Sequence, residues 1–395
     1  MSAPVAVTGL SCLCAAGLTL PETLHTLYQG QRNPRVSDNI TTDHKIDYPV
    51  FEVSPEFKAL EGSEQLTRCS QFALVATQQA LIDAGYTQEE LSGLTVGVAV
   101  GTTVDSPLKF EDFYRNFRSS EDPDFSLLEP SLKSNPAYCV KEEWDLNGPC
   151  LTVVNACTSG ADAIGLGALW IRQGLCDVVI AGGSDALNRV TYNGFRSLQI
   201  LNDSPCTPFD KNRRGLNLGE GAGMLVLESE SQRKRKQHTV KAYLTGYGSA
   251  TDAHHLTAPK PDGSGLKKAV EEALSNSTCT ATELAFINAH GTGTQDNDKV
   301  ECKVMTEVFP HTPFLSTKGY MGHTLGAAGA IEAALTIACL AKGKLPKSVG
   351  FSQEDEVCAR SPITENMVIE KKSALSQSLA FGGCNTALIF SVEGI

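Results

Sequence analysis

Short runs of apolar residues recur along the sequence, and most of them stop at a small or polar turn that leads into a segment with helical spacing. The run from Leu151 to Val154 is the clearest case. It ends at a turn that contains Cys157, and a helical pattern of apolar residues then continues to Ile171. This order of strand, turn and helix is typical of βαβ units, which form parallel sheets with helices on their faces. The pattern therefore predicts an α/β protein.

Other apolar runs and helical patterns extend this prediction over the whole chain. Residues 95–100 have the continuous apolar character of a strand that is buried on both faces. Residues 104–147 are aromatic, charged and marked by prolines, and they predict an irregular insertion that shapes a substrate site or an interface. Further strands are expected at 5–9, 178–181, 224–228, 240–246, 284–288, 313–317, 376–380 and 387–392, and helices at 21–28, 63–85, 266–274 and 325–340.

The second part of the chain repeats the pattern of the first. A charged run, SESQRKRKQH, separates the two parts and is typical of a solvated linker. After it, the strand and polar turn at 284–294 correspond to those at 98–102. We therefore predict two duplicated halves whose strand ends meet in a shared cleft. Residues 1–237 form the half that carries Cys157, and residues 238–395 form the half that carries two candidate histidines.

The composition narrows the function classes. With 395 residues, of which 41% are hydrophobic, the chain can bury a large core. A net charge of -12 and the lack of a basic, aromatic-rich face argue against nucleic acid as a partner. The first residues lack the charged and apolar regions of a signal peptide, and no apolar run approaches membrane-spanning length, so we expect a cytoplasmic protein. The 13 scattered cysteines include no CxxC pair, which predicts reduced thiols.

Cys157 is the candidate nucleophile. Its predicted place is the end of a strand, where the next helix directs free N–H groups and the positive end of its dipole toward the thiol. That environment favours the thiolate, and the same N–H groups could hold a developing oxyanion. The alternative is that Cys157 is a small buried hydrophobe, as most cysteines are.

Two histidines and a lysine follow predicted strand ends in the second half, at His290, Lys318 and His323. Either histidine could instead be a core residue whose ring is satisfied by backbone groups. A cysteine with one histidine indicates base-activated acyl transfer. A cysteine with two histidines and a lysine indicates N–H donors that converge on a carbonyl as it becomes an enolate. Lys318, with Glu332, would keep an imidazole neutral by lowering its pKa.

Two other motifs are weaker. The glycines of Gly219-Glu-Gly-Ala-Gly223 come before a strand, whereas a dinucleotide fingerprint comes before a helix, so a Rossmann site is not expected. Asp252-Ala-His254-His255 offers neighbouring imidazoles, but adjacent side chains of a strand point to opposite faces, so we expect no metal site there.

Taken together, the motifs resemble those of the elongating β-ketoacyl-acyl carrier protein synthases, the condensing enzymes of fatty acid and polyketide synthesis. The resemblance covers nearly the whole chain, with the motifs in the family's order. It implies a thiolase-like five-layer αβαβα sandwich built from two similar halves. It also implies a homodimer, or a dimer with a close ketosynthase-like paralogue. The motifs are Asn155-Ala-Cys157-Thr-Ser-Gly, Pro208-Phe-Asp, Gly219-Glu-Gly-Ala-Gly, Asn288-Ala-His290-Gly-Thr-Gly-Thr with Asn297-Asp298, Ser316-Thr-Lys318 with Gly322-His323, Gly326-Ala-Ala-Gly329 and Phe381-Gly-Gly-Cys-Asn385.

The resemblance also implies the reaction. Cys157 would take an acyl chain from an acyl carrier protein, and His290 and His323 would stabilise the enolate that forms when a malonyl thioester loses carbon dioxide. The enolate would then attack the acyl-cysteine and give 3-oxoacyl-acyl carrier protein in fatty acid, polyketide or polyene synthesis. No cofactor is expected, because the phosphopantetheine arm arrives on the carrier. The alternative is a subunit of a heterodimeric ketosynthase that acts with a chain-length-factor-like paralogue.

Other residues receive supporting roles from the resemblance. Lys318 and Glu332 resemble the family's ion pair, and Asp298 and Glu301 its structural acidic residues. The backbone N–H groups of Cys157 and Phe381 would form the oxyanion hole, and Phe381 resembles a gate. Substrate-binding positions are expected at Thr292, Thr294, Gly382 and Gly383. Carrier docking on an acidic enzyme requires a local basic patch, for which the candidates are Arg68, Arg196, Arg213 and Arg214.

The sequence departs from the family pattern near its end and in the insertion. Leu379-Ala380-Phe381-Gly-Gly-Cys384-Asn385 stands where Gly-Phe-Gly-Gly-Thr-Asn is common. Ala380 is expected to restrict the gating loop, and Leu379 to reshape the acyl entrance. Residues 104–147 are shorter and more charged than usual, so the preferred acyl length is not predicted.

Three related proteins are weaker interpretations. A thiolase would need a second catalytic cysteine ahead of the glycine-rich end motif, whereas Cys384 follows it. A starter-type condensing enzyme would pair its cysteine with a histidine and an asparagine, which the motifs at His290 and His323 argue against. A catalytically inert partner subunit would lack the nucleophile, and this chain retains Cys157.

Overall fold

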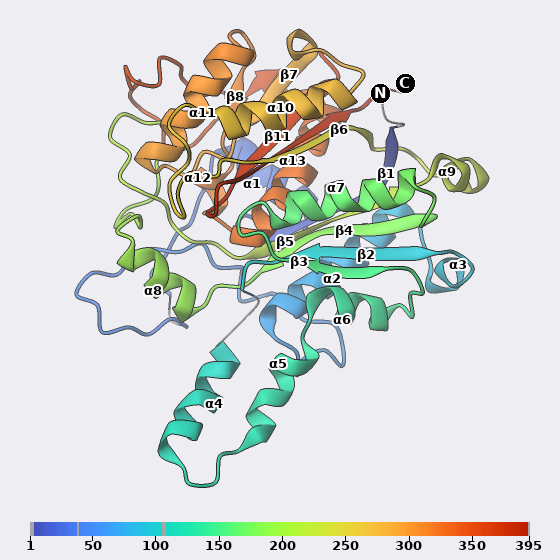
Figure 1. Ribbon diagram of the computed structural model, residues 1–395, viewed down its shortest axis with the longest axis vertical. Helices are drawn as coiled ribbons and strands as arrows, with labels where there is room; N and C mark the ends of the chain where they lie inside the picture. Colours follow the sequence, from blue (N-terminus) through green and yellow to red (C-terminus); the bar gives the residue numbers. More distant parts are fainter. Residues whose placement is uncertain (1–3, 38, 105–107, 394–395) are drawn as a thin grey trace.

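The computed structural model describes residues 4–37, 39–104 and 108–393. Within that part of the chain, ten strands follow one another by hydrogen bonding in the order β3-β2-β4-β5-β1-β6-β12-β11-β7-β8 (Figure 1). A further pair, β9 and β10, lies apart. The strands are β1 Val5–Cys14, β2 Val96–Gly101, β3 Cys150–Val153, β4 Val178–Asp185, β5 Gly221–Glu228, β6 Ala242–Thr251, β7 Leu284–Asn288, β8 Phe314–Leu315, β9 Lys344–Leu345, β10 Met367–Val368, β11 Ser373–Leu379 and β12 Cys384–Ser391.

The strand order demonstrates the internal repeat. Outward from the centre, the first half runs β1, β5, β4, β2, β3, and the second half runs β6, β12, β11, β7, β8. The same relative order occurs in both halves, as predicted from the repeated pattern. The halves join where β1 pairs antiparallel with β6. The expectation of parallel sheets is wrong for one strand of each half, because β5 is antiparallel to β4 and β1, and β12 is antiparallel to β11 and β6.

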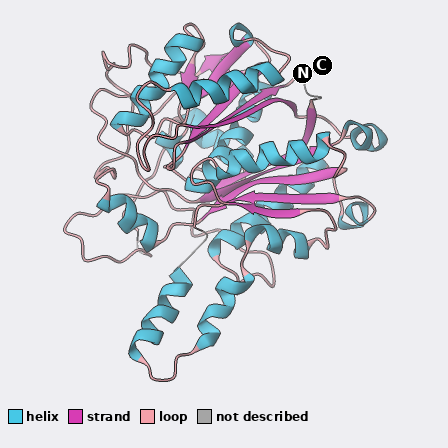
Figure 2. Cartoon of the chain, viewed as in Figure 1, coloured by secondary structure: helices cyan, strands magenta, loops and turns pink. Residues whose placement is uncertain are grey.

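The five strands of each half form one layer, and helices cover the outer faces of the two layers and separate their inner faces (Figure 2). The outer face of the first half packs against α2 and α6, and the outer face of the second half packs against α10 and α11. Between the halves lie α7 and α13, which gives the predicted order of helix, sheet, helix, sheet, helix. The helices are α1 Leu20–Gln29, α2 Arg68–Ala84, α3 Gln88–Ser92, α4 Leu108–Ser119, α5 Glu129–Lys133, α6 Pro136–Glu143, α7 Ser159–Arg172, α8 Arg189–Ser197, α9 Glu230–Lys236, α10 Ser264–Asn276, α11 Gln295–Val308, α12 Lys318–Met321 and α13 Ala328–Lys342, with 3₁₀ turns η1 Phe125–Leu128, η2 Ala281–Glu283 and η3 Leu325–Ala327.

Alternation along the strands explains the layers. In β5, Leu225 and Leu227 face the central helices, whereas Met224 and Val226 face the outer ones. Both faces are apolar, because successive side chains of a strand point to opposite faces and both faces are covered.

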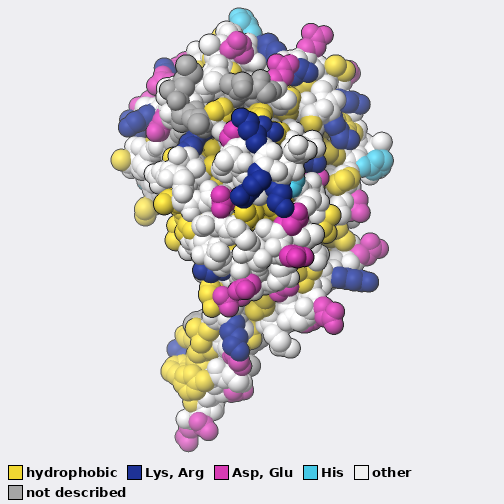
Figure 3. Space-filling model, turned by 90° about the vertical axis from the view of Figure 1, so that its right-hand side faces the viewer, with side chains coloured by type: hydrophobic (Ala, Val, Ile, Leu, Met, Phe, Trp, Pro, Cys, Tyr) yellow, Lys and Arg dark blue, Asp and Glu magenta, His cyan; other side chains and the backbone are white. Residues whose placement is uncertain are grey.

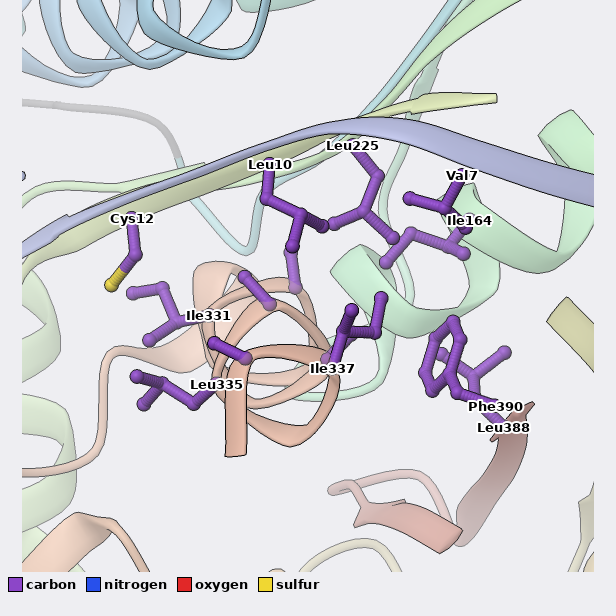
Figure 4. Close-up of a cluster of buried hydrophobic side chains, with 14 of the residues drawn as sticks. Val7, Leu10, Cys12, Ile164, Leu225, Ile331, Leu335, Ile337, Leu388 and Phe390 are labelled. Atoms are coloured by element: carbon purple, nitrogen blue, oxygen red, sulfur yellow. The ribbon is translucent and has the colours of Figure 1, made fainter. Parts of the chain in front are cut away.

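The central layer holds the largest apolar cluster (Figure 4). Ile331 and Leu335 of α13 lie there with Leu225 from the first half and Leu388 from the second. The stretch Leu325–Lys342 is long and apolar enough to cross a membrane, but 89% of its most apolar window is buried inside the molecule. Its apolar character therefore belongs to a core helix that contacts both sheets.

The structure differs from the sequence prediction at two segments. Residues 104–147 are not irregular where they are described: α4 and α5 form a projecting helical hairpin, and α6 returns to the body (Figure 1). The charged linker contains the short helix α9, in which Glu230 pairs with Arg233 and Lys234. A charged pair at helical spacing, Glu129 with Lys133, supports α5 in the same way.

Candidate active site

Cys157 lies in the turn between β3 and α7, as the sequence predicted. Ala156, immediately before it, has a φ of 49°. Ser159 at the start of α7 holds this left-handed turn, since its Oγ donates to the Ala156 carbonyl at 2.6 Å and accepts from the Asn155 N–H at 2.8 Å. The turn directs the Cys157 side chain into a cavity, where it is 5% exposed.

Burial of the Cys157 thiol works against the thiolate that is expected from the sequence. Burial raises its pKa to about 12, although the nearby charge of Lys318 and the backbone N–H of Phe381 both act to lower it. Desolvation is the largest of these influences on the thiol. His323 Nε2 lies 3.0 Å from the sulfur.

Two imidazoles face the same space as Cys157. His290 follows β7, and His323 follows α12, so both come from the second half. Their ring centroids are 5.1 Å apart and the rings are nearly perpendicular, at 87°. Burial, and secondly the charge of Lys318, holds the pKa of each imidazole well below its usual value. Both rings are therefore neutral at physiological pH.

A buried lysine fixes the tautomer of His290. Lys318 Nζ lies 3.1 Å from His290 Nδ1 and also contacts Glu332 on α13. An ammonium group can only donate, so Nδ1 accepts and the ring proton must be on Nε2. Burial raises the pKa of Glu332 to about 7 even though Lys318 acts to lower it. Nδ1 of His323 has no partner among the described residues, so no such contact fixes the tautomer of that ring.

Asp298 and Glu301 on α11 lie behind the histidine turn and hold its backbone. Glu301 accepts from the N–H groups of His290 at 2.7 Å and Gly291 at 2.6 Å. Asp298 accepts from the N–H groups of Gly293 and Phe209. These contacts position the turn without directing either carboxylate toward Cys157.

Cys157, His290 and His323 line a cavity of about 220 Å³. Thr292 and Thr294 also line it, and their hydroxyls are 2.9 Å apart. The remaining walls combine apolar and polar side chains that include Phe195, Ile200, Leu216, Leu379, Phe381, Arg214, Gln295 and Asp296. The cavity is therefore large enough for a narrow chain and is open where Arg214, Gln295 and Asp296 are exposed.

Phe381 closes one side of the cavity and stacks on Phe195, with centroids 5.5 Å apart. Gly382 and Gly383 are not among the residues that line the cavity. They have φ angles of 85° and 79° and turn the chain from β11 into β12. Their conformation positions Phe381 at the cavity wall, and their contact with substrate stays a prediction.

The predicted docking arginines separate into different environments. Arg213 is buried, and its guanidinium binds Asp355 at 2.6 Å beside Asp298, so it has no surface to offer a carrier. Arg68 is committed to Glu220 and lies over the ring of Phe72. Arg196 on α8 is exposed. Burial therefore excludes Arg213 from the surface, because a distant segment brings a partner that the local sequence does not reveal. The side chain of Arg68 is 39% exposed, so its role in docking stays a prediction.

Several residues of the site were not singled out from the sequence, among them Phe195 and Asp185. Phe195, which stacks on Phe381, lies on the buried face of the amphipathic helix α8. Asp185 is a fully buried carboxylate at the end of β4 that accepts from the N–H groups of Gly326 at 2.6 Å and Thr103 at 2.9 Å. A polar residue that ends an apolar strand is the signal that could have identified it.

Comparisons with known proteins agree with this geometry. Models for the Beta-ketoacyl synthase N-terminal domain and C-terminal domain match residues 2–233 and 241–352. The chain is 30% identical to a 3-oxoacyl-(acyl-carrier-protein) synthase 2 of Synechocystis sp., over 98% of this chain and 97% of the relative. It is also 30% identical to the ketoacyl synthase alpha subunit of the tetracenomycin polyketide synthase of Streptomyces glaucescens, over 96% and 92%. Among solved structures, the ishigamide ketosynthase/chain length factor has a TM-score of 0.94 and 28% identity, with 100% of both chains covered.

Proposed function

Since the chain belongs to the β-ketoacyl synthase family, whose elongating members extend an acyl chain by decarboxylative condensation with malonyl-acyl carrier protein, we propose that Cys157, His290 and His323 perform this reaction here. The observation that carries the proposal is the gathering of one thiol and two neutral imidazoles from opposite halves in one cavity. A single histidine would serve acyl transfer, but a second neutral donor has no use in that step.

In the first step the sulfur of Cys157 attacks the carbonyl of an acyl carrier thioester. The thiol proton passes to Nε2 of His323, which is 3.0 Å away, and then leaves with the thiol of the phosphopantetheine arm. The Phe381 N–H, which acts to lower the pKa of this thiol, stabilises the oxyanion together with the Cys157 N–H. The products are acyl-Cys157 and the free carrier.

In the second step a malonyl thioester loses its carboxylate as carbon dioxide. The electron pair of the broken bond forms an enolate, whose oxygen accepts a hydrogen bond from Nε2–H of His290. His323 donates the second hydrogen bond from Nε2–H, in the tautomer opposite to the one that acts as base in the first step, and no contact among the described residues holds its proton on Nδ1. The enolate carbon attacks acyl-Cys157, the carbon–sulfur bond breaks, and the released thiolate takes up a proton. Lys318 supports this step because its contact keeps His290 in the donating tautomer. Thr292 and Thr294 line the path of the pantetheine arm.

The chain also presents an unpaired sheet edge that suits a dimer. In β3, Leu151 is 47% exposed, and Val154 directly after it is 67% exposed. The hairpin of α4 and α5 continues this apolar surface, and Figure 3 shows hydrophobic side chains gathered on the projection. The partner would be a second copy or a ketosynthase-like paralogue. The second possibility is favoured by the likeness to a ketosynthase/chain length factor and to a ketoacyl synthase alpha subunit.

Several finer assignments belong to the same proposal. The carrier delivers both substrates, so the enzyme needs no cofactor of its own, and the cytoplasm is the proposed location.

The division into residues 1–237 and 238–395 is supported by the two family models, of which the first ends at residue 233 and the second begins at residue 241. Arg196 and Arg214 are the favoured candidates for carrier docking, because both are exposed and Arg214 lines the cavity.

The decisive experiment uses malonyl carrier with a labelled carboxyl group and an acyl carrier. Cys157→Ala should abolish acyl transfer and leave the fold intact, since a small residue suits this small-residue turn. His290→Ala should suppress carbon dioxide release more than acylation of Cys157. Cys176→Ala, at another buried cysteine, is the matched control and should retain both activities. A Cys157→Ala enzyme that still joins the two substrates, or a His290→Ala enzyme with normal carbon dioxide release, would refute the assignment.

A further inference from the structure

A polar connection joins the nucleophile turn to the loop that carries Phe381. Asn155, two residues before Cys157, donates from Nδ2 to Asp162 Oδ2 at 2.7 Å. On its other side, the Cys384 thiol donates to Asn155 Oδ1 at 3.0 Å. Asn155 and Asp162 belong to the first half and Cys384 to the second, so the connection crosses between the halves.

The direction of these bonds follows from chemistry. A carboxylate only accepts, so Asp162 fixes the amide of Asn155 with its NH₂ group toward the carboxylate and its oxygen toward Cys384. An amide oxygen also only accepts, so the thiol of Cys384 must be the donor. Burial, together with the charge of Asp162, raises the pKa of Cys384 and keeps this thiol protonated at neutral pH.

Asp162 is itself rigidly held. Its Oδ1 accepts from Thr386 Oγ1 at 2.6 Å and from the Tyr247 hydroxyl at 3.2 Å, and the residue is buried in the first turn of α7. The carboxylate thus ties the start of α7 to β12 and β6. We call the hydrogen-bonded series Asp162, Asn155 and Cys384 the Asn155 bridge. Asp162 anchors one end of the bridge, and the donor and the acceptor of each of its hydrogen bonds are determined.

The other end of the bridge controls the Phe381 loop. The Ala380 N–H donates to the Cys384 carbonyl at 2.8 Å, and the Gly383 N–H donates to the Ala380 carbonyl at 3.1 Å, so residues 380–384 form a closed turn. Phe381 lies inside this turn and lines the same cavity as Cys157, and its backbone N–H acts to lower the pKa of the Cys157 thiol. A displacement of Cys384 therefore displaces this N–H relative to the nucleophile.

We propose that Cys384 is a positioning residue that acts through the Asn155 bridge to keep the oxyanion-stabilising N–H of Phe381 in register with Cys157. The inference rests on the proposed function and extends it to residues that touch no substrate. It assigns the bridge to the acyl-transfer step, because the enolate of the second step is stabilised by His290 and His323 instead. A hydroxyl at position 384 could make the same donation, whereas a methyl group could not.

The test measures the two half-reactions separately. Acylation of Cys157 is followed by intact mass in single turnovers with an acyl carrier, and decarboxylation by carbon dioxide release from malonyl carrier. For Cys384→Ala we expect the saturating acylation rate to fall about tenfold, because a displaced oxyanion donor is a transition-state loss, with the half-saturating concentration changed by less than about twofold. Carbon dioxide release should be unchanged, and Cys384→Ser should restore acylation.

Controls separate positioning from general damage. Cys279→Ala, at a cysteine of similar exposure outside the site, should acylate normally. Adding Cys384→Ala to Asn155→Ala should cause no further loss, because both changes break one connection. If Cys384→Ala does not fold, Asp162→Asn gives the same test, since it removes the constraint on the amide direction.

The outcomes also distinguish this inference from the proposed function. Normal acylation by Cys384→Ala, no recovery in Cys384→Ser, or equal losses in both half-reactions would overturn the positioning role. A wild-type enzyme that never accepts an acyl group on Cys157 would instead refute the proposed function.

Discussion

His290 illustrates how one buried contact sets both the charge and the proton position of a side chain. The ammonium of Lys318 faces Nδ1, so the ring accepts there and donates from Nε2. The same positive charge, added to burial, opposes a second proton. The lysine therefore prepares the imidazole as a neutral donor without touching the reacting atoms.

This arrangement predicts an unusual pH profile. An imidazole is neutral above its pKa, and the pKa values of His290 and His323 lie well below the usual value. We expect the rate of carbon dioxide release from malonyl carrier to stay level as the pH falls from about 8 to about 6, a range in which ordinary histidines become protonated. The measurement is carbon dioxide release against pH, with folding checked at each pH by circular dichroism. A half-maximal rate near pH 6.5 would contradict the neutral-donor role.

Lys318→Met should affect both stability and this profile. The second carboxylate oxygen of Glu332 has no partner among the described residues, so removing the ammonium leaves a buried carboxyl unpaired. The free energy of unfolding should fall by about 3–5 kcal/mol in urea titrations. The pKa of His290 should rise, which moves the loss of decarboxylation at acidic pH to a higher pH.

The double variant Lys318→Met/Glu332→Leu is the matched control for that result. It removes both charges, so it should be more stable than Lys318→Met alone. Equal stability of the two variants would show that the lysine does not compensate the charge of Glu332.

At the residue scale, the sequence identified the motifs of Cys157, His290, Lys318 and His323, and the structure brings these side chains together. It could not predict how strongly burial works against the Cys157 thiolate, because the degree of burial depends on segments far away in the chain. It could not predict the burial of Arg213 either, since its partner Asp355 is more than a hundred residues distant. The burial and pairing of a charged residue can be predicted from the sequence when its partner is close in the chain, but not when the partner is far away in the chain.

At the scale of elements, the two central helices depend on small residues where they cross. A Cβ added at Gly329 of α13 would lie 2.8 Å from the Cβ of Ala161 and 2.9 Å from its backbone nitrogen. Similarly, a Cβ at Gly160 of α7 would lie 2.7 Å from the Gly326 carbonyl oxygen. The Cys157 turn is at the start of α7 and Glu332 is on α13, so this close packing also sets the spacing of the site.

Gly329→Ala should therefore destabilise the protein by about 1–3 kcal/mol through overpacking, because the opposing atoms include backbone. The free energy of unfolding in urea measures this effect. Gly194→Ala is the matched control: it lies in α8, has no atom within 4 Å of the added Cβ, and should gain about 0.5–1 kcal/mol from helix propensity. A Gly329→Ala protein as stable as wild type would show that the crossing has spare room.

Most elements could be predicted from the sequence because their apolar periods are strong, as in β2 and α13. The projection of the α4–α5 hairpin could not, because its exposed aromatic residues interrupt the polar pattern that a solvated helix shows. Tyr114, Phe117 and Phe125 are about half exposed or more in the single chain. The apolar period of α4 buries Phe113 against Phe117 and Phe125 within the hairpin, so it indicates a helix but not that the helix projects from the body.

At the scale of the whole molecule, the exposed edge at β3 predicts the oligomeric state. Leu151→Lys combined with Val154→Lys should convert the proposed dimer to separate chains, because charges on a sheet edge oppose pairing. Sedimentation of the chain, alone and co-expressed with its partner subunit, measures the change. Val368→Lys, on the exposed short strand β10, is the matched control and should leave the dimer intact. Unchanged sedimentation of the double variant would exclude β3 from the interface.

The global architecture was accessible from sequence because the repeat was visible in the order of strands, turns and helices. The direction of β5 could not be predicted from the sequence. A βαβ pattern gives the direction of strands that are joined by a crossover helix, and β5 is not joined to its neighbours in that way. The partner at β3 is also not encoded in the pattern, because the same exposed edge could accept a copy or a paralogue.

The join between the halves has an evolutionary consequence. Within the part of the chain that the structure describes, three residue pairs connect β1 to β6: Val5 with Leu244, Ala6 with Tyr243 and Val7 with Ala242. An ancestral single unit could have associated with its own copy through this strand, as a symmetric pair with two identical centres. Gene fusion would then have freed each copy from supplying every group, so that one retained sulfur chemistry and the other the chemistry of proton donors. On this view the one active site of the enzyme descends from two identical active sites. The parts of each copy that lost their catalytic groups kept only a structural role.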